Sequence, residues 1–322
     1  MTEAKGTSGL RIARQYAQEG RIPFRVRLKA WWEGYDLKLP AIDTPVKTKT
    51  HEVRAPEKKV PWSDGRIGLV QEVWGDGFDR PGGEKFVIEL LKPVGLDSSM
   101  NILELGAGLG GATRAIAKTF DVYITGMETD ANLAQVGNEL SNIAGLGKKA
   151  PIEEQDLNFL ELKQRNYDCI FSKEAFFTVP DKTMLLDAIE QGLKPGGQLL
   201  FTDYVLVDSR ADSEELQAWR EIDPVRVALW SASDYRDALN DLRLDIPISE
   251  DITARTATMI KKNWGTYMAT AKQSGKLAEH GETVLEEAEL WTRRLRALEA
   301  GELRVYRFHA LKKKDGRLLA NW

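Results

Sequence analysis

The middle of the chain alternates short apolar runs with segments whose apolar residues recur at helical spacing. Five runs have the length and the β-branched or aromatic content of strands: Asn101–Leu105, Val122–Met127, Ile152–Gln155, Tyr167–Ser172 and Gln198–Tyr204. Helices are predicted between them, over Gly111–Thr119, Asp130–Ala144 and Lys182–Leu193. Strands that alternate with helices in this way are typical of βαβ units, so the pattern predicts a parallel sheet covered by helices.

The chain after the fifth strand changes character. It is mostly helical, with two further strand patterns at Leu242–Ile248 and Leu303–Leu311. A tight turn is predicted at Lys194-Pro195-Gly196-Gly197, where Pro and Gly stop the preceding helix. The fold class that follows is α/β, with a doubly wound, mostly parallel, seven-stranded Rossmann-like sheet, an N-terminal arm and a helical cap.

Four parts are predicted along the sequence: an N-terminal arm at 1–66, a core at 67–210, a helical cap at 211–302 and a final strand with its tail at 303–322. One core strand, near 242–248, lies within the cap region. In the arm, basic residues precede Trp31 and Trp32, which would suit an amphipathic helix on anionic lipid. Because Gly20 and Pro23 interrupt such a helix, we expect an arm that covers the active site or contacts a second subunit.

Composition excludes several kinds of chemistry. The 322 residues include 45 basic and 49 acidic ones, and a formal charge of −4 argues against a nucleic-acid binder. One cysteine and three scattered histidines give neither an internal disulfide nor the spacing of a metal site. Without an apolar leader or a run of about 18 apolar residues, we expect a cytoplasmic protein with no membrane contact.

The clearest motif is a glycine-rich turn after the first strand. Residues 104–111 read E-L-G-A-G-L-G-G, so a strand runs into glycines and then into a helix whose N-terminal N–H groups are free. Dinucleotide-binding enzymes have a similar turn, so the glycine-rich turn alone is a weak signal. Glu104, two residues before the first glycine, is suited to contacting an ammonium group.

Polar residues also follow the next strands. Glu128 ends the second strand, where a carboxylate can accept hydrogen bonds from both ribose hydroxyls. Asp156, followed by Leu157, could accept the amino group of adenine, and Ser172 ends the fourth strand. Each acid alone is typical of a solvated surface. The carboxyl ends of parallel strands share one crevice. The glycine turn, Glu128, Asp156 and Ser172 together therefore predict a site for a nucleoside-bearing cofactor.

Residues 67–205, and more loosely the chain to 322, resemble the class I S-adenosylmethionine-dependent methyltransferases. The resemblance is carried by the glycine turn, Gly126-Met127-Glu128, Asp156 and the segment from Tyr167 to Gly197. Within that class the chain is most similar to phosphoethanolamine and glycine-sarcosine enzymes, through residues 74–83 and 201–204.

The resemblance implies S-adenosyl-L-methionine as cofactor, S-adenosyl-L-homocysteine as product, and no metal. It implies a set of cofactor-binding residues: Glu104, Gly106, Gly108, Glu128, Asp156, Leu157 and Ser172, with Gly82 closing over the cofactor. A small-molecule acceptor and a homodimer are expected with it. The helices within 253–299 fit a dimer face or a lid equally well.

One departure from the phosphobase enzymes bears on the acceptor. Those enzymes have an acidic residue after the fourth strand and, four residues later, a histidine used in proton removal. Here the acid is Glu174 and the histidine is replaced by Thr178. Methylation of a protonated amine, a hydroxyl or a thiol needs a proton to leave, whereas a thioether has no proton to lose. The absence of a base therefore favours S-methylation.

The whole chain is also similar to bacterial S-methyltransferases of dimethylsulfoniopropionate synthesis, which act on 4-methylthio-2-hydroxybutyrate. For such a carboxylate-bearing acceptor we expect Arg226 as the anion-binding group and Trp230 as an aromatic wall for the sulfonium. Glu174 and Tyr204 are the candidate catalytic residues, positioning the acceptor or, for an amine, serving as base. The alternatives are N-methylation of a phosphobase or glycine-like amine, a lipid methyltransferase, and a silent S-adenosylmethionine-binding regulator.

Overall fold

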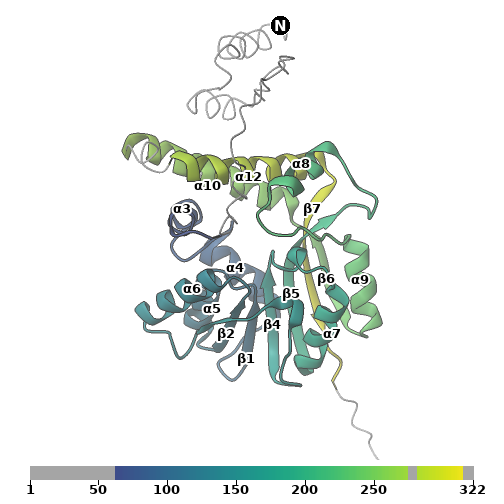
Figure 1. The fold of residues 1–322 in the computed structure, drawn as a ribbon. Helices are drawn as coiled ribbons and strands as arrows, with labels where there is room; N and C mark the ends of the chain where they lie inside the picture. Colours follow the sequence, from purple (N-terminus) through teal and green to yellow (C-terminus); the bar gives the residue numbers. More distant parts are fainter. Residues whose placement is uncertain (1–61, 275–280, 315–322) are drawn as a thin grey trace, which may run out of the picture.

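The computed structural model describes residues 62–274 and 281–314, which form one open sheet flanked by helices (Figure 1). The sheet has seven strands in the order β3-β2-β1-β4-β5-β7-β6. β7 runs antiparallel to both neighbours, β5 and β6, and the other pairs are parallel. The predicted doubly wound, mostly parallel, seven-stranded sheet is confirmed. The strand order reverses between β1 and β4, which is where ligands bind in open sheets of this kind.

The strands follow the predicted apolar runs closely. Their bounds are β1 Asn101–Leu105, β2 Tyr123–Glu128, β3 Ile152–Glu154, β4 Tyr167–Lys173, β5 Leu193–Leu206, β6 Asp245–Asp251 and β7 Leu303–Leu311. β6 begins three residues later than predicted. Helix α9 continues to Asp241, and Arg243 then takes a left-handed conformation with φ of 60°.

The predicted turn at Lys194–Gly197 is wrong, because these residues belong to β5. Leu193 pairs with Tyr167 and Gln198 pairs with Cys169, so a bulge absorbs the intervening residues of β5. Gly196, at φ of 81°, supplies the backbone conformation for the bulge, and its N–H donates to the carbonyl of Lys312.

The helices are α3 Asp64–Trp74, α4 Gly83–Leu91, α5 Gly111–Phe120, α6 Ala131–Ile143, α7 Lys182–Gly192, α8 Glu214–Ile222, α9 Ala232–Asp241, α10 Thr253–Ser274 and α12 Gly281–Ala300. The three helices predicted between the strands are confirmed as α5, α6 and α7. Short 3-10 turns follow at η1 Lys92–Val94, η2 Leu157–Phe159 and η3 Phe176–Thr178. Asp130 and Asp181 begin α6 and α7 by accepting backbone N–H groups of the first turn.

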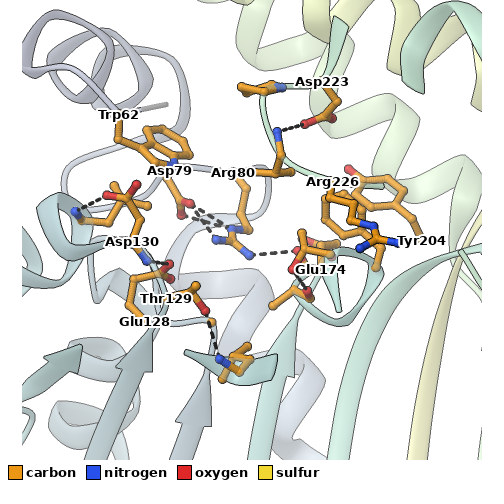
Figure 2. Close-up of a pocket in the computed structure, with 18 of the residues that line it drawn as sticks. Trp62, Asp79, Arg80, Glu128, Thr129, Asp130, Glu174, Tyr204, Asp223 and Arg226 are labelled. Atoms are coloured by element: carbon orange, nitrogen blue, oxygen red, sulfur yellow. Dashed lines mark hydrogen bonds and ion pairs between the residues drawn. The ribbon is translucent and has the colours of Figure 1, made fainter. Parts of the chain in front are cut away.

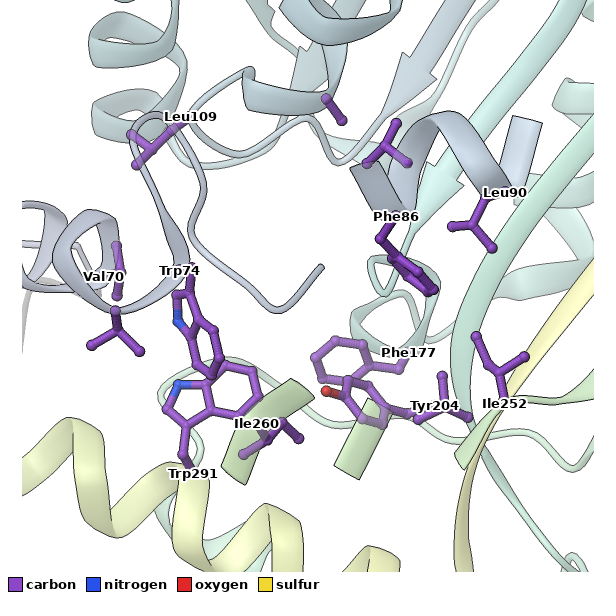
Figure 3. Packing of buried hydrophobic residues seen from close by; sticks show 14 of the residues in the cluster. Val70, Trp74, Phe86, Leu90, Leu109, Phe177, Tyr204, Ile252, Ile260 and Trp291 are labelled. Carbon is purple, nitrogen blue, oxygen red and sulfur yellow. The ribbon is translucent and has the colours of Figure 1, made fainter. Parts of the chain in front are cut away.

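Alternating strand residues divide the interior into two apolar clusters, one on each face of the sheet. In β1, Ile102 belongs to the cluster beneath α3, α4 and α5, while Leu103 and Leu105 belong to the cluster beneath α7 and α9. The first cluster extends into α10 and α12, where Trp74 of α3 packs against Trp291 with ring centroids 4.5 Å apart (Figure 3). The helices beyond the sheet therefore share the core of the sheet.

Helices α8, α10 and α12, which we call the cap helices, lie together at one end of the molecule (Figure 1). Within the part of the chain that the structure describes, no helix combines the length and the apolar character needed to span a membrane. The predicted arm at 1–66 falls outside the described residues up to position 61, so its role stays a prediction.

Candidate active site

A cavity of about 380 Å³ opens between the strand ends and the cap helices (Figure 2). Three groups of residues line it. The strand ends and their loops contribute Gly106, Glu128, Thr129, Asp130, Leu133, Leu157, Asn158, Glu174, Ala175, Phe177, Thr178, Val179 and Tyr204. The cap helices and the loop after α8 contribute Asp223, Pro224, Val225, Arg226, Glu287, Leu290, Trp291 and Arg294. The segment before β1 contributes Trp62, Arg66, Asp79 and Arg80.

Glu128 lies at the wall of the cavity with its carboxylate held from the protein side. Oε2 accepts the N–H of Gly108 at 2.7 Å, and Oε1 accepts the N–H of Asp130 at 3.0 Å. Burial is the main cause that raises the pKa of Glu128 above its ordinary value. Since each carboxylate oxygen has two acceptor sites, both oxygens keep one for a ligand hydroxyl.

The glycine turn admits no side chain at its second glycine. Gly108 has φ of 55°, and a Cβ there would lie 2.6 Å from Oδ1 of Asp79. Gly106 lines the cavity with its backbone, as predicted for a turn that lets a ligand approach closely.

Glu104 lies behind this turn and is not among the residues that line the cavity. Its carboxylate accepts the hydroxyl of Thr113 at 2.6 Å, and burial raises its pKa from the ordinary 4.5 to about 7. Ser172 is also set back from the cavity: it is fully buried, and its hydroxyl donates to the carbonyl of Leu105 at 2.8 Å. Glu104 therefore joins β1 to α5, and Ser172 joins β4 to β1.

The two cofactor residues predicted after β3, Asp156 and Leu157, have different positions relative to the cavity. Leu157 and its neighbour Asn158 line the cavity. The Asp156 carboxylate instead begins the turn η2 by accepting the N–H of Asn158 at 2.9 Å and its side-chain amide at 2.7 Å. Gly82, at φ of 123°, precedes α4 and is not on the cavity wall. Asp79 and Arg80, which lie slightly earlier in the same segment, do line the cavity.

Arg80 was not predicted as a site residue, although it lines the cavity between Asp79 and Glu174 (Figure 2). Its Nη2 donates to Oδ2 of Asp79 at 2.7 Å, and Nη1 donates to the carbonyls of Lys173 and Glu174 at 2.6 and 3.0 Å. Burial disfavours the charge of Arg80, but Asp79, together with Glu128 and Glu174, raises its pKa above the ordinary value. The guanidinium therefore stays charged while it joins the segment before α4 to the end of β4.

Glu174 lies at the end of β4 in a left-handed conformation with φ of 44°. Both of its carboxylate oxygens have partners: Oε2 accepts the ammonium of Lys173 at 2.6 Å, and Oε1 accepts the hydroxyl of Thr202 at 2.7 Å. Tyr204, the other candidate catalytic residue, is 1% exposed and packs edge-on against Phe177 (Figure 3). Burial is the main cause that raises the pKa of the Tyr204 phenol, so it stays protonated at neutral pH.

The opposite wall comes from α12, a helix for which the sequence suggested a dimer face or a lid but no individual site residue. Glu287, Trp291 and Arg294 lie on one face of this helix and all three line the cavity. Glu287 accepts Nε of Arg66 at 2.7 Å and the indole N–H of Trp291 at 2.9 Å. The sequence signal for this wall is a set of charged residues at helical spacing together with a tryptophan. A solvated helix face has the same pattern, so the signal does not identify a site.

The two predicted acceptor-binding residues have different positions. Arg226 is exposed and lines the cavity. Trp230 is half-buried away from the wall and packs against Tyr235, with ring centroids 5.3 Å apart. His309 is also remote, since it lies in β7 beside Gln198 at 2.7 Å, and His51 and His280 fall outside the described residues.

Comparison with known proteins identifies the family of the chain. Residues 80–246, more than half of the chain, match the family described as "Methyltransferase domain". The chain belongs to this methyltransferase family. The predicted enzyme class is confirmed by this match.

Curated relatives of the methyltransferase include phosphoethanolamine N-methyltransferase 1 of Arabidopsis thaliana, 26% identical over 63% of this chain and 40% of the relative. Another is the glycine/sarcosine/dimethylglycine N-methyltransferase of Actinopolyspora halophila, 27% identical over 47% of this chain and 26% of the relative. The methyltransferase thus spans less than half the length of these relatives.

Solved structures share its fold. Phosphoethanolamine N-methyltransferase 2 of Haemonchus contortus, in complex with S-adenosyl-L-methionine, aligns with a TM-score of 0.73 at 20% identity over 80% of this chain and 59% of that chain. A putative sarcosine dimethylglycine methyltransferase from Galdieria sulphuraria aligns with a TM-score of 0.66 at 20% identity, over 79% and 98% of the two chains. The cofactor predicted from the sequence is the one bound in the Haemonchus protein.

Proposed function

We propose that the methyltransferase transfers a methyl group from S-adenosyl-L-methionine to the sulfur of a thioether that carries a carboxylate, such as 4-methylthio-2-hydroxybutyrate. When bound, the cofactor supplies an electrophilic methyl group on a sulfonium. The acceptor sulfur gives its lone pair to the methyl carbon, the bond to the cofactor sulfur breaks, and the products are a new sulfonium and S-adenosyl-L-homocysteine. No proton is released.

The residues around the glycine turn suit this cofactor. Glu128 would bind the ribose hydroxyls, because its oxygens keep free acceptor sites at the cavity wall. Leu133 and Leu157 would hold the adenine between apolar surfaces, with Asp156 positioning that turn. Gly106 and Gly108 would let the backbone approach the methionine part, while Glu104, Ser172 and Gly82 support the surrounding loops.

The observation that carries the proposed acceptor is that the carboxylates facing the cap helices already have partners. Glu174 is bound by Lys173 and Thr202. Asp223 is bound by Arg294 and Trp219, and Glu287 by Arg66 and Trp291. A protonated amine must lose its proton before it can attack, which needs a group free to accept that proton. A thioether attacks without one.

Aromatic rings favour the same acceptor. Phe177, Tyr204 and Trp291 line this part of the cavity, so they exclude water and present ring faces to a developing sulfonium. Glu174 and Tyr204 then act by positioning the acceptor, and Arg226 offers a positive charge at the wall. The reaction needs orientation and desolvation more than acid–base chemistry.

N-methylation of a phosphobase or glycine-like amine is the second candidate. It is favoured by the names of the relatives, which are N-methyltransferases of phosphoethanolamine and of glycine, sarcosine and dimethylglycine. It is disfavoured because the carboxylates of Glu174, Asp223 and Glu287 already have hydrogen-bond partners.

The test combines product identity with proton release. The purified protein would be given S-adenosyl-L-methionine with 4-methylthio-2-hydroxybutyrate, phosphoethanolamine, glycine or dimethylglycine, and the products identified by mass spectrometry. A pH indicator in weak buffer would report protons released per S-adenosyl-L-homocysteine formed. We expect a sulfonium product and no proton release. Methylation of nitrogen alone, with one proton released per turnover from a protonated amine, would refute the proposal.

A further inference from the structure

We infer that Arg294 forms the subsite for the acceptor's carboxylate. The inference rests on the proposed function, since it names the group that anchors the far end of that acceptor. Arg294 belongs to α12 and lines the cavity from the side opposite the strand ends. It is 8% exposed, which is uncommon for an arginine on the wall of an open site.

The hydrogen bonds of Arg294 are incomplete in a way that points to a ligand. Nη2 donates to Oδ2 of Asp223 at 2.5 Å. Nε is buried and has no hydrogen-bond partner among the described residues. A buried donor without a partner is costly, more so on a charged group. Because the Arg294 side chain lines the cavity, a ligand carboxylate there would accept from its guanidinium in the charge-assisted geometry that arginine favours, and would balance a group whose Nε is closed off and unpaired.

Four aromatic rings hold the guanidinium in a fixed orientation. Its central carbon lies 4.5 Å from the ring centroid of Trp291, 5.1 Å from Tyr204, 5.2 Å from Trp219 and 5.8 Å from Phe177. Trp219 also donates its indole N–H to the same Asp223 oxygen at 2.7 Å. Because the side chain is already immobilised, little conformational entropy is lost when a ligand binds to it.

The charges on this wall suit one negative group. Near the cap helices Arg66 is paired with Glu287 and Arg294 with Asp223, so the charge of Arg226 is left over locally, although the whole lining has six carboxylates and four arginines. The buried Lys173–Glu174 pair adds no net charge. A monocarboxylate would neutralise the wall, whereas a cationic ammonium next to Arg294 would be repelled.

Burial distinguishes Arg294 from Arg226, the residue that the sequence suggested. Arg226 is exposed, so water and salt screen its charge. Arg294 acts within an aromatic enclosure of lower dielectric, where a charge-assisted hydrogen bond is stronger. Arg294 is therefore the main anchor of the carboxylate and Arg226 assists it.

The test compares Arg294→Gln with the matched control Arg226→Gln. Initial rates give KM and kcat for 4-methylthio-2-hydroxybutyrate and for its neutral amide, and calorimetry gives the Kd of S-adenosyl-L-homocysteine. We expect Arg294→Gln to raise KM for the acid roughly 10- to 100-fold, to leave the amide little affected, and to keep cofactor affinity. Arg226→Gln should raise KM only a few-fold. Equal losses on acid and amide would show a purely structural role and overturn the inference.

Loss of Arg294 leaves Asp223 with one partner fewer, so the single variant could fold poorly. The double variant Asp223→Asn/Arg294→Gln removes both charges; Asn keeps the shape of Asp, and Gln is a shorter neutral side chain that can still hydrogen-bond to it. Calorimetric titration of the acid into either variant loaded with S-adenosyl-L-homocysteine measures binding without turnover. Wild-type affinity in a folded variant would overturn the inference while leaving the proposed function intact. If no thioether is methylated by the wild type, the proposed function fails instead, and binding of the acid still tests the subsite.

Discussion

Arg80 and Glu174 are joined by a hydrogen bond from the guanidinium Nη1 to the backbone carbonyl, 3.0 Å long. The same guanidinium is paired with Asp79, so one side chain connects the segment before α4 to the end of β4. Glu174 has a left-handed backbone at this point, which costs free energy in a residue with a side chain. Arg80 thus stabilises the conformation that shapes the floor of the cavity.

Replacing Arg80 by Gln should weaken cofactor binding and lower stability together. The variant leaves the buried Asp79 carboxylate unpaired and frees two carbonyls, so we expect the free energy of unfolding to fall by about 1–3 kcal/mol. Urea unfolding and calorimetry with S-adenosyl-L-homocysteine measure both effects. The double variant Asp79→Asn/Arg80→Gln, which removes the unpaired carboxylate, should recover part of the stability but not the affinity. Unchanged affinity in the single variant would show that Arg80 has no part in shaping the site.

Glu128 and Ser172 make a matched pair, because the sequence suggested both for cofactor binding and the structure places only Glu128 on the cavity wall. Glu128→Gln should weaken S-adenosyl-L-homocysteine binding roughly 5- to 30-fold, since it removes the charge from the hydrogen bonds to ribose. Ser172→Ala should leave that affinity within about threefold, because the hydroxyl is bound to Leu105. Calorimetry on both variants checks this, and a larger loss in Ser172→Ala would return Ser172 to the cofactor.

The sheet was predictable because its central strands are buried on both faces. Such strands appear as continuous apolar runs, and Asn101–Leu105 is a clear example. The positions of Gly106 and Glu128 at one edge then followed from parallel topology alone. The bulge at Lys194–Gly197 did not, because Pro and Gly are equally typical of a turn, and only the pairing with β4 distinguishes the two.

The far wall of the site could not be predicted for a different reason. Arg294 and Asp223 are 71 positions apart, and the burial of each depends on the other. Local pattern shows only a charged residue on an amphipathic helix, which is normally solvated. The partner of Ser172 could not be predicted for a similar reason, since a polar residue at a strand end does not reveal whether its hydroxyl is directed to a ligand or to the neighbouring strand.

Glu104 should make stability depend on pH. Burial raises its pKa from 4.5 to about 7 in the folded chain, so between these values the folded chain holds a proton that the unfolded chain has lost. The free energy of unfolding should therefore decrease as pH rises from 4.5 to 7, by on the order of 3 kcal/mol. Glu104→Gln removes this contribution. Burial also raises the pKa of Asp203 to about 7, so the unfolding free energy of the variant still depends on pH through Asp203.

The measurement for Glu104 is urea unfolding of wild type and Glu104→Gln without cofactor at several pH values. The difference in unfolding free energy between the two proteins should change across pH 4.5–7 and be constant above it. A difference that does not vary with pH would mean that Glu104 titrates normally in the folded chain.

Lys182 should control the acceptor side of the cavity without touching it. Its ammonium is fully buried and donates to the carbonyls of Val179 and Ala228. The N–H of Ala228 in turn donates to the carbonyl of Phe177 at 2.7 Å. Lys182 therefore joins the loop that carries Arg226 to the loop that carries Phe177.

Replacing Lys182 by Met keeps the apolar length and removes the donor, so the two loops lose part of their connection. We expect KM for the acceptor to rise several-fold, while the Kd of S-adenosyl-L-homocysteine stays near the wild-type value because Glu128 and the glycine turn are unaffected. Steady-state kinetics and calorimetry separate the two quantities. Lys182→Arg is the control, since it keeps a donor at the end of a long side chain and should recover part of the acceptor affinity if it fits. A Met variant that loses acceptor and cofactor affinity equally would mean that Lys182 stabilises the whole domain rather than positioning the acceptor loops.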